Sequence, residues 1–168
     1  MDVCCRRMRP MLGTFVAIEC RAPDAAIAAR AIESAFAAVC RVDALMHPTR
    51  AGGDLVSIGN APVGQGVHVD AWTWQVLELS KRLHERSGGR FDPCLPDRPG
   101  TVDDIALPAL GQVVCAAPVA IDLGGVAKGF AVDRAIDALR LAGCSAGHVN
   151  AGGDMRVFWS NGLVGSIT

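Results

Sequence analysis

The order of hydrophobic and polar residues predicts strands near both ends of the chain and helices between them. Leu12–Cys20 (LGTFVAIEC) is short and rich in β-branched residues, which is typical of a strand buried on one face. Further along, His148–Asn150 and Met155–Trp159 are expected to form two more strands, joined by a turn at Gly152-Gly153. These segments together predict a sheet.

Three longer stretches have the spacing of helices. In Asp24–Met46, large apolar residues recur at near-helical intervals among charged ones. A second helix is expected over Ala71–Ser87, with Asp70 as its N-cap and Gly88 as its left-handed stop. A third helix is expected over Val126–Ala142. The end of the second helix is polar and is expected to be solvated; it holds Lys81, Arg82, His84, Glu85 and Arg86.

The connecting segments are rich in proline and glycine and are expected to be largely irregular. His47–Gly66 is predicted to be a loop with one short helical turn at Leu55–Ile58. Phe91–Pro108 is predicted to be irregular, and Val113–Cys115 and Val119–Asp122 to form two short strands, as in a hairpin. Helices mixed with short antiparallel strands favour an α+β fold over a doubly wound parallel sheet. The expected architecture is a layered sandwich of mainly antiparallel sheet with packed helices.

Composition and charge favour a folded domain over a disordered, nucleic-acid-binding or membrane-spanning protein. A length of 168 residues suffices for one compact domain, and 51% hydrophobic against 20% charged residues excludes intrinsic disorder. The net charge of −1 gives no electrostatic basis for nucleic-acid binding, and no apolar run reaches the ~18–20 residues of a membrane span. The first residues lack the apolar stretch of a secretory signal, so a cytoplasmic location is expected.

The seven cysteines include no C-x-x-C pair, so the sequence supports neither a zinc ribbon nor a thioredoxin-type redox motif. Most have aliphatic neighbours, where cysteine behaves as a small buried hydrophobe. A disulfide framework is not expected either, because so apolar a chain can build a core without one. The cysteines are therefore predicted to be structural.

The segment Ile121–Arg134 (IDLGGVAKGFAVDR) is the most informative for chemistry. A hydrophobic strand ends at Asp122, Gly124-Gly125 allow a ligand to approach the backbone closely, and a helix follows at once. Free N–H groups and the positive end of the helix dipole attract anions there, and Lys128 adds a full positive charge. The pattern matches neither the P-loop nor the dinucleotide fingerprint. Two interpretations stay open: a phosphate site, or a glycine-rich corner with a surface lysine.

Two further segments carry candidate polar groups. Asn150 and Asp154 flank a double glycine, so they either contact a ligand or simply form a tight turn. The segment Gly88–Pro93 (GGRFDP) ends a helix and presents Asp92. Neither segment identifies a function by itself.

Taken together, these segments resemble the FAD:protein FMN transferase family, also called ApbE. The family has a D-[LF]-G-G-[IV]-A-K-G-[YF]-A-V-D block, matched at Asp122–Asp133, and an N-x-G-G-D turn, matched at Asn150–Asp154. It also has a G-G-x-F-D-P segment, matched at Gly88–Pro93, and an L-G-T or M-G-T start, matched at Leu12–Thr14. The resemblance implies a Mg²⁺-dependent enzyme that transfers FMN from FAD to a Ser or Thr hydroxyl of a target flavoprotein and releases AMP.

The resemblance also implies a set of site residues, although it leaves the catalytic residue unknown. Leu12 takes the place of a flavin-contacting Met, and the backbone carbonyls of Gly125 and Ala127 would supply metal ligands. The remaining residues expected to contact or line the FAD site are Phe91, Asp92, Pro93, Cys94, Asp122, Lys128, Asn150 and Asp154.

The sequence departs from the family pattern in ways that keep alternatives open. Cys94 replaces a Thr, Met46–Asn60 lacks the family's aromatic, and family members continue well beyond the Asn150–Asp154 turn. Residues 1–168 are therefore expected to form a single ApbE-like domain without the family's C-terminal portion, whose unpaired sheet edges would favour a homodimer. One alternative is a truncated, non-catalytic flavin-binding homologue. Another is a metal hydrolase that uses His68 and Asp70 together with His47 or His148.

Overall fold

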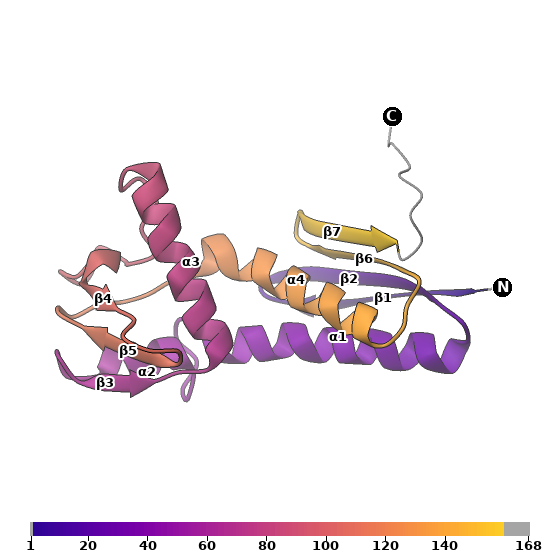
Figure 1. The fold of residues 1–168 in the computed structure, drawn as a ribbon, viewed down its shortest axis with the longest axis horizontal. Coiled ribbons are helices and arrows are strands. Elements are labelled where there is room, and N and C mark those ends of the chain that lie inside the picture. Colours follow the sequence, from indigo (N-terminus) through magenta and orange to yellow (C-terminus); the bar gives the residue numbers. More distant parts are fainter. Residues whose placement is uncertain (1, 160–168) are drawn as a thin grey trace. The chain divides into compact units, whose positions relative to one another are not determined.

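The computed structural model describes residues 2–159, which form two compact units. Unit 1 contains the described residues up to Arg41 and from Lys128 onward, and unit 2 contains Val42–Ala127. Two long helices, α1 (Ala25–Met46) and α4 (Gly124–Leu141), contribute residues to both units (Figure 1).

Unit 1 is built on a four-stranded antiparallel sheet in the order β1-β2-β6-β7 (Figure 1). The strands are β1 (Val3–Met11), β2 (Thr14–Ala22), β6 (Ala146–Ala151) and β7 (Asp154–Trp159). Every second residue of β2 and β6 is buried, which is the period of a strand with one face covered. The buried residues are Val16, Ile18, Cys20, Ala22, Gly147, Val149 and Ala151.

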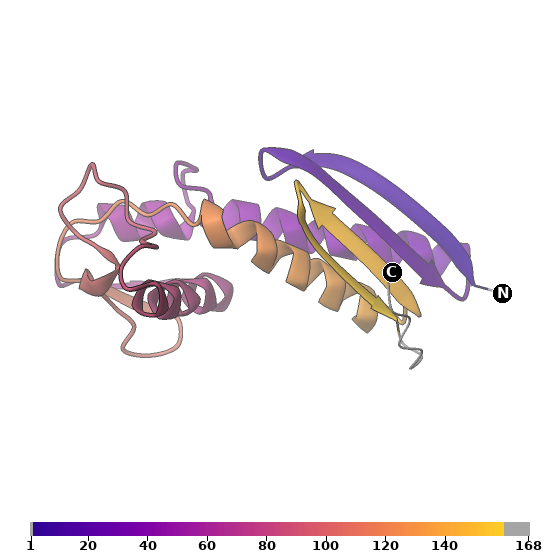
Figure 2. The same cartoon turned by 90° about the horizontal axis from the view of Figure 1, so that it is seen from above.

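Within unit 1, the helices cover this buried face of the sheet (Figure 2). Phe36 of α1 is 1% exposed and lies under the guanidinium of Arg9, whose Cζ is 4.2 Å from the ring centroid. The Cys20 thiol donates to the carbonyl of Ala28 in α1 at 3.8 Å. A Cβ at Gly147 would lie 2.8 Å from Leu139 Cδ1 of α4, so this glycine allows the helix to pack closely on the sheet.

A two-residue turn at Leu12-Gly13 joins β1 to β2, with φ of 56° and 69° respectively. The prediction that the first strand begins at Leu12 is therefore wrong by two residues, and β1 was not predicted at all. A hairpin this tight requires left-handed backbone at both turn positions, because only then does its twist match that of the strands. Leu12 adopts this left-handed conformation although its Cβ makes the conformation sterically unfavourable.

Replacing Leu12 by Asn is expected to raise the free energy of unfolding by about 0.5–1 kcal/mol, because Asn tolerates the left-handed conformation that strains Leu. Urea denaturation measures the change. Met11→Asn, in ordinary strand backbone one residue earlier, is the control and is expected to give no gain. Equal effects of the two variants would contradict the assignment of strain to Leu12.

Unit 2 combines helices with a three-stranded antiparallel sheet in the order β3-β5-β4. Asp70 begins α3 as predicted, since its side chain accepts a hydrogen bond from Trp72 N at 2.9 Å, and Gly88 ends it at φ 63°. The elements are α2 (Asp54–Asn60), β3 (Gly66–His68), α3 (Ala71–Ser87), the 3-10 helix η1 (Val102–Asp104), β4 (Ile105–Ala106) and β5 (Gln112–Cys115).

The predicted strand at Val119–Asp122 and its hairpin with β5 are wrong. In the structure β5 pairs with β3 and β4, and Ile121 forms only an isolated bridge with Cys94. The backbone of this stretch instead donates and accepts hydrogen bonds along residues 93–100, for example from Leu95 N to Ala120 O at 2.7 Å. The backbone N–H and C=O groups in these bonds are therefore not available to pair with β5 in a hairpin.

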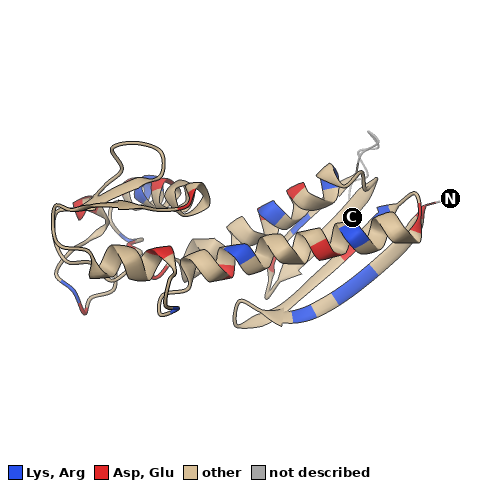
Figure 3. Cartoon of the chain, turned by 90° about the horizontal axis from the view of Figure 1, so that it is seen from below, with Lys and Arg blue, Asp and Glu red and all other residues tan. Residues whose placement is uncertain are grey.

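The α+β class with antiparallel sheets is confirmed. Among residues 2–159, no helix combines the length and the apolar character needed to cross a bilayer. Basic and acidic residues are interspersed along the helices rather than separated by sign (Figure 3).

Candidate functional site

Asp122 leads directly into α4 as predicted, although an isolated bridge at Ile121 takes the place of the predicted strand before it. Asp122 is exposed, and its Oδ1 accepts a hydrogen bond from Gly124 N at 2.8 Å, so α4 begins two residues earlier than expected. A Cβ at Gly125 would lie 3.4 Å from Phe91 Cε2. The missing side chain at Gly125 therefore allows the aromatic ring of Phe91 to pack closely against the first turn of α4.

The segment Phe91–Cys94 lies beside this corner. Pro93 O accepts a hydrogen bond from Asp122 N at 2.8 Å, which ties the segment to the start of α4. The Asp92 carboxylate accepts from Cys94 N at 2.8 Å and from Val102 N at 3.3 Å. Ala127, the last sequence-predicted residue of unit 2, follows in the first turn of α4. The other predicted residues of this unit are brought together by backbone hydrogen bonds and one aromatic contact: Phe91, Asp92, Pro93, Cys94, Asp122 and Gly125.

The Cys94 thiol is part of this cluster, and its environment keeps it protonated. Burial raises the pKa of Cys94 to about 12, and the nearby negative charge of Asp92 acts in the same direction. A thiol that loses its proton only near that pH is a poor nucleophile at neutral pH. Cys94 is therefore suited to line the site rather than to react.

Cys94 is expected to resist alkylation by iodoacetamide at pH 8, whereas the exposed Cys40 is modified first. The thiolate is the reactive form, and a pKa of about 12 leaves very little of it at that pH. Mass spectrometry of peptides taken over time measures both rates. Modification of the two residues at equal rates would show that Cys94 is more open than the structure indicates.

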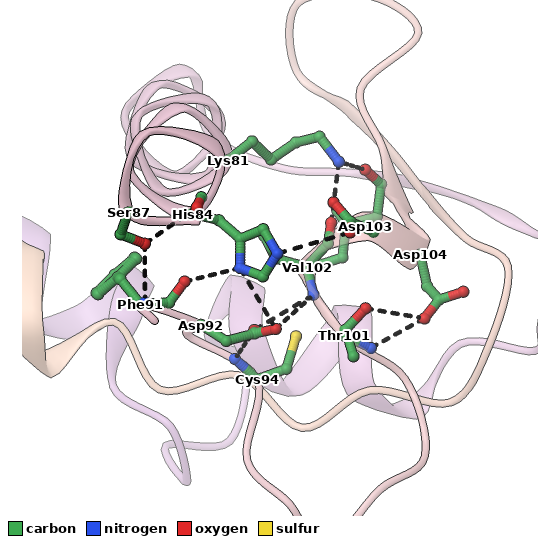
Figure 4. Close-up of polar contacts among 11 residues, drawn as sticks. Lys81, His84, Ser87, Phe91, Asp92, Cys94, Thr101, Val102, Asp103 and Asp104 are labelled. Carbon is green, nitrogen blue, oxygen red and sulfur yellow. Dashed lines mark hydrogen bonds and ion pairs between the residues drawn. The ribbon is translucent and has the colours of Figure 1, made fainter. Parts of the chain in front are cut away.

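Sequence reasoning missed a second layer of residues behind this segment, drawn in Figure 4. Lys81 and His84 were expected on the solvated end of α3, yet both are partly buried. Lys81 Nζ donates to Val102 O at 2.9 Å and to Ile105 O at 2.6 Å. Nδ1 of His84 is 2.7 Å from Phe91 O. These partners are backbone carbonyls, which every residue carries, so no sequence motif indicates them.

The remaining predicted residues belong to unit 1. Asn150 Oδ1 accepts a hydrogen bond from Gly153 N at 3.0 Å, so this side chain shapes the turn between β6 and β7. A Cβ at Gly152 would lie 2.8 Å from Thr14 Oγ1, which places this turn against the Leu12-Gly13 hairpin turn. Asp154 is exposed at the start of β7. Lys128, also in unit 1, is half-buried in the second turn of α4.

Residues 2–159 contain no group of three or more His, Cys, Asp or Glu side chains that could hold a metal ion. Asp70, a candidate ligand in the hydrolase alternative, serves as the N-cap of α3. Gly125 and Ala127 lie in the first turn of α4, where their carbonyls take part in the helix. The described side chains thus form no metal cluster beside the corner.

The fold is that of known flavin transferases. The structure matches the flavinyl transferase ApbE of Pseudomonas stutzeri with a TM-score of 0.82 at 17% identity, over 93% of this chain and 61% of that chain. It matches the flavin transferase ApbE of Vibrio cholerae with a TM-score of 0.81 at 19% identity, over 94% and 60% of the two chains. The apbe protein of Thermotoga maritima gives 0.81 at 23% identity, over 92% and 59%.

The family itself is shown by the sequence. A sequence model of the ApbE family matches residues 12–97 and 99–162, so the chain belongs to the ApbE family. A comparison with curated protein sequences gave no match. The chain spans about three fifths of the length of the solved proteins that it resembles.

Proposed function

We propose that this chain is a FAD:protein FMN transferase, which moves FMN from FAD to a Ser or Thr hydroxyl of a target flavoprotein. The observation that carries the proposal is the glycine corner at Gly124-Gly125, joined to the Phe91–Cys94 segment within a sequence that the ApbE family model matches. The names of the solved relatives, flavin and flavinyl transferase, support the same class of activity. In this proposal residues 1–168 act as one ApbE-like domain.

The reaction breaks one phosphoanhydride bond of FAD and forms one phosphoester bond. The acceptor hydroxyl oxygen bonds to the phosphorus of the FMN part, the bridging oxygen leaves with AMP, and the hydroxyl proton passes to solvent. Positioning and charge neutralisation are the main contributions of a protein to such transfers. In our proposal the N–H groups at the start of α4 and the Lys128 ammonium receive the diphosphate, and Phe91 provides an apolar wall.

The family resemblance implies Mg²⁺, which neutralises the diphosphate and orients in-line attack when it is bound. The described side chains do not assemble a cluster for it, because the Asp92 carboxylate and Asp122 Oδ1 already accept backbone N–H groups. A hard cation held only by carbonyls and water binds weakly. We therefore derive no step of the reaction through the ion and treat the Mg²⁺ requirement as part of the test.

The test is to incubate the purified chain with FAD, MgCl₂ and an acceptor flavoprotein that carries a Ser or Thr target. The expected result is stoichiometric AMP, measured by chromatography, and an acceptor whose mass has increased by the mass of FMN minus one water molecule. Replacing the target Ser or Thr by Ala must abolish both products. Adding EDTA, which removes free Mg²⁺, shows whether the reaction requires the ion. Absence of AMP with an acceptor that another ApbE protein modifies would overturn the proposal.

A second candidate is a homologue that binds flavin without transferring it. It would use the same start of α4 and the same Phe91–Cys94 segment to hold the nucleotide, without a transfer step. Calorimetry separates the two candidates: heat of FAD binding without AMP release supports the second, and heat together with AMP supports the first.

A further inference from the structure

Two side chains in the last turn of α3 hold the Phe91–Cys94 segment through hydrogen bonds that no sequence motif indicates. We infer that His84 is a positioning residue that fixes the backbone of Phe91, and through it the nucleotide-lining segment. The inference deepens the proposed function and rests on it, since the segment is part of the proposed FAD site. His84 does not itself contact the ligand in this proposal.

Both backbone polar groups of Phe91 are held by side chains of α3 (Figure 4). Phe91 N donates to Ser87 Oγ at 3.0 Å, and Nδ1 of His84 is 2.7 Å from Phe91 O. The chain leaves α3 through Gly88 and Gly89, both with positive φ, and reaches Phe91 outside any strand. The two side chains therefore replace the pairing that a strand would give this residue.

The hydrogen-bond partner of His84 determines which ring nitrogen carries the hydrogen. A backbone carbonyl only accepts hydrogen bonds, so Nδ1 carries the hydrogen and donates it to Phe91 O. Asp92 Oδ2 lies 3.7 Å from Nδ1, and Asp103 Oδ2 lies 3.6 Å from Nε2. Both separations exceed a direct hydrogen bond, so these carboxylates act on the ring only through their charge or through water. The hydrogen bond from His84 to Phe91 O is therefore the contact that fixes the position of the Phe91 backbone.

Holding Phe91 also determines where its neighbours lie. The ring of Phe91 reaches the space beside Gly125, and the next residue, Asp92, accepts N–H groups from Cys94 and Val102. Side-chain exposure of His84 is 17%, so its bond to Phe91 is shielded from competing water. Releasing Phe91 from His84 should loosen the whole segment without unfolding α3.

The experiment compares His84→Ala with His84→Asn, whose amide nitrogen can occupy the place of Nδ1. In the ligand-free protein, amide hydrogen exchange is measured at Phe91, Cys94 and Val102. FAD affinity is measured separately by titration. We expect His84→Ala to speed exchange at Phe91 and Cys94 by about tenfold and to weaken FAD binding by about tenfold, while His84→Asn restores most of both. His68→Ala, on an exposed histidine of the same unit, is the matched control.

Exchange rates within twofold of wild type in His84→Ala would overturn the inference, and so would failure of His84→Asn to restore them. If His84→Ala melts globally, Ser87→Ala provides the second test, because it frees the other polar group of Phe91 and must loosen the same amides. The proposed function fails separately: a wild-type chain that binds no FAD overturns it, whatever the exchange pattern says about His84.

Discussion

Replacement of Lys128 by alanine is expected to weaken FAD binding by about ten- to hundredfold. A hydrogen bond to a charged group contributes about 1.5–3 kcal/mol, and each 1.4 kcal/mol corresponds to a factor of ten in affinity. Lys128 is half-buried in the second turn of α4, where a diphosphate at the helix start would be within the influence of its charge. Isothermal calorimetry with FAD, with and without MgCl₂, measures the loss.

Two variants make the Lys128 result specific. Lys128→Arg keeps the charge and is expected to retain most of the affinity, although the planar guanidinium binds phosphate with different geometry. Arg86→Ala removes the same charge from an exposed position at the end of α3 and should leave FAD binding within twofold. If Lys128→Ala binds as tightly as wild type while its circular dichroism is unchanged, the helix start is a structural corner and does not receive the diphosphate.

Phe36→Ala is expected to lower the free energy of unfolding by about 3–5 kcal/mol, which is the usual cost of removing a buried aromatic ring. Phe36 is 1% exposed, and its loss removes the packing of α1 on the sheet of unit 1 together with the contact that Arg9 makes over the ring. Urea denaturation followed by circular dichroism measures the change.

Phe15→Ala is the matched control for this core prediction. It removes the same ring from the opposite face of the sheet, where Phe15 is 61% exposed, and should cost no more than about 0.5 kcal/mol. Equal losses at the two positions would mean that the helices do not cover the face of the sheet that contains Val16 and Ile18.

The sequence predicts best those elements whose signals are local. Asp70 and Gly88 mark the ends of α3 because a capping carboxylate and a left-handed residue act on their own helix. The paired glycines at the start of α4 are evident for the same reason. In contrast, β1 was missed because Arg6, Arg7 and Arg9 interrupt its hydrophobic pattern, although charged side chains are common on an edge strand.

The part of the site that the sequence does not indicate depends on contacts between distant segments. Asp92 accepts from Val102, ten residues further on, and Lys81 donates to the carbonyls of Val102 and Ile105. Hydrophobic periodicity reports which face of a helix is covered, but it does not report which carbonyl an ammonium or an imidazole will reach. His84 therefore looked like one more polar residue at a helix end.

The way Phe91 is held separates its backbone from its side chain. Its N–H and C=O are both engaged by Ser87 and His84, so the path of the chain at this point does not depend on what the ring touches. A substitution at position 91 is therefore expected to change the contact with Gly125 more than the course of the loop. Under the proposed function, varying this one residue would change the apolar wall beside Gly125 and leave the backbone of the segment in place.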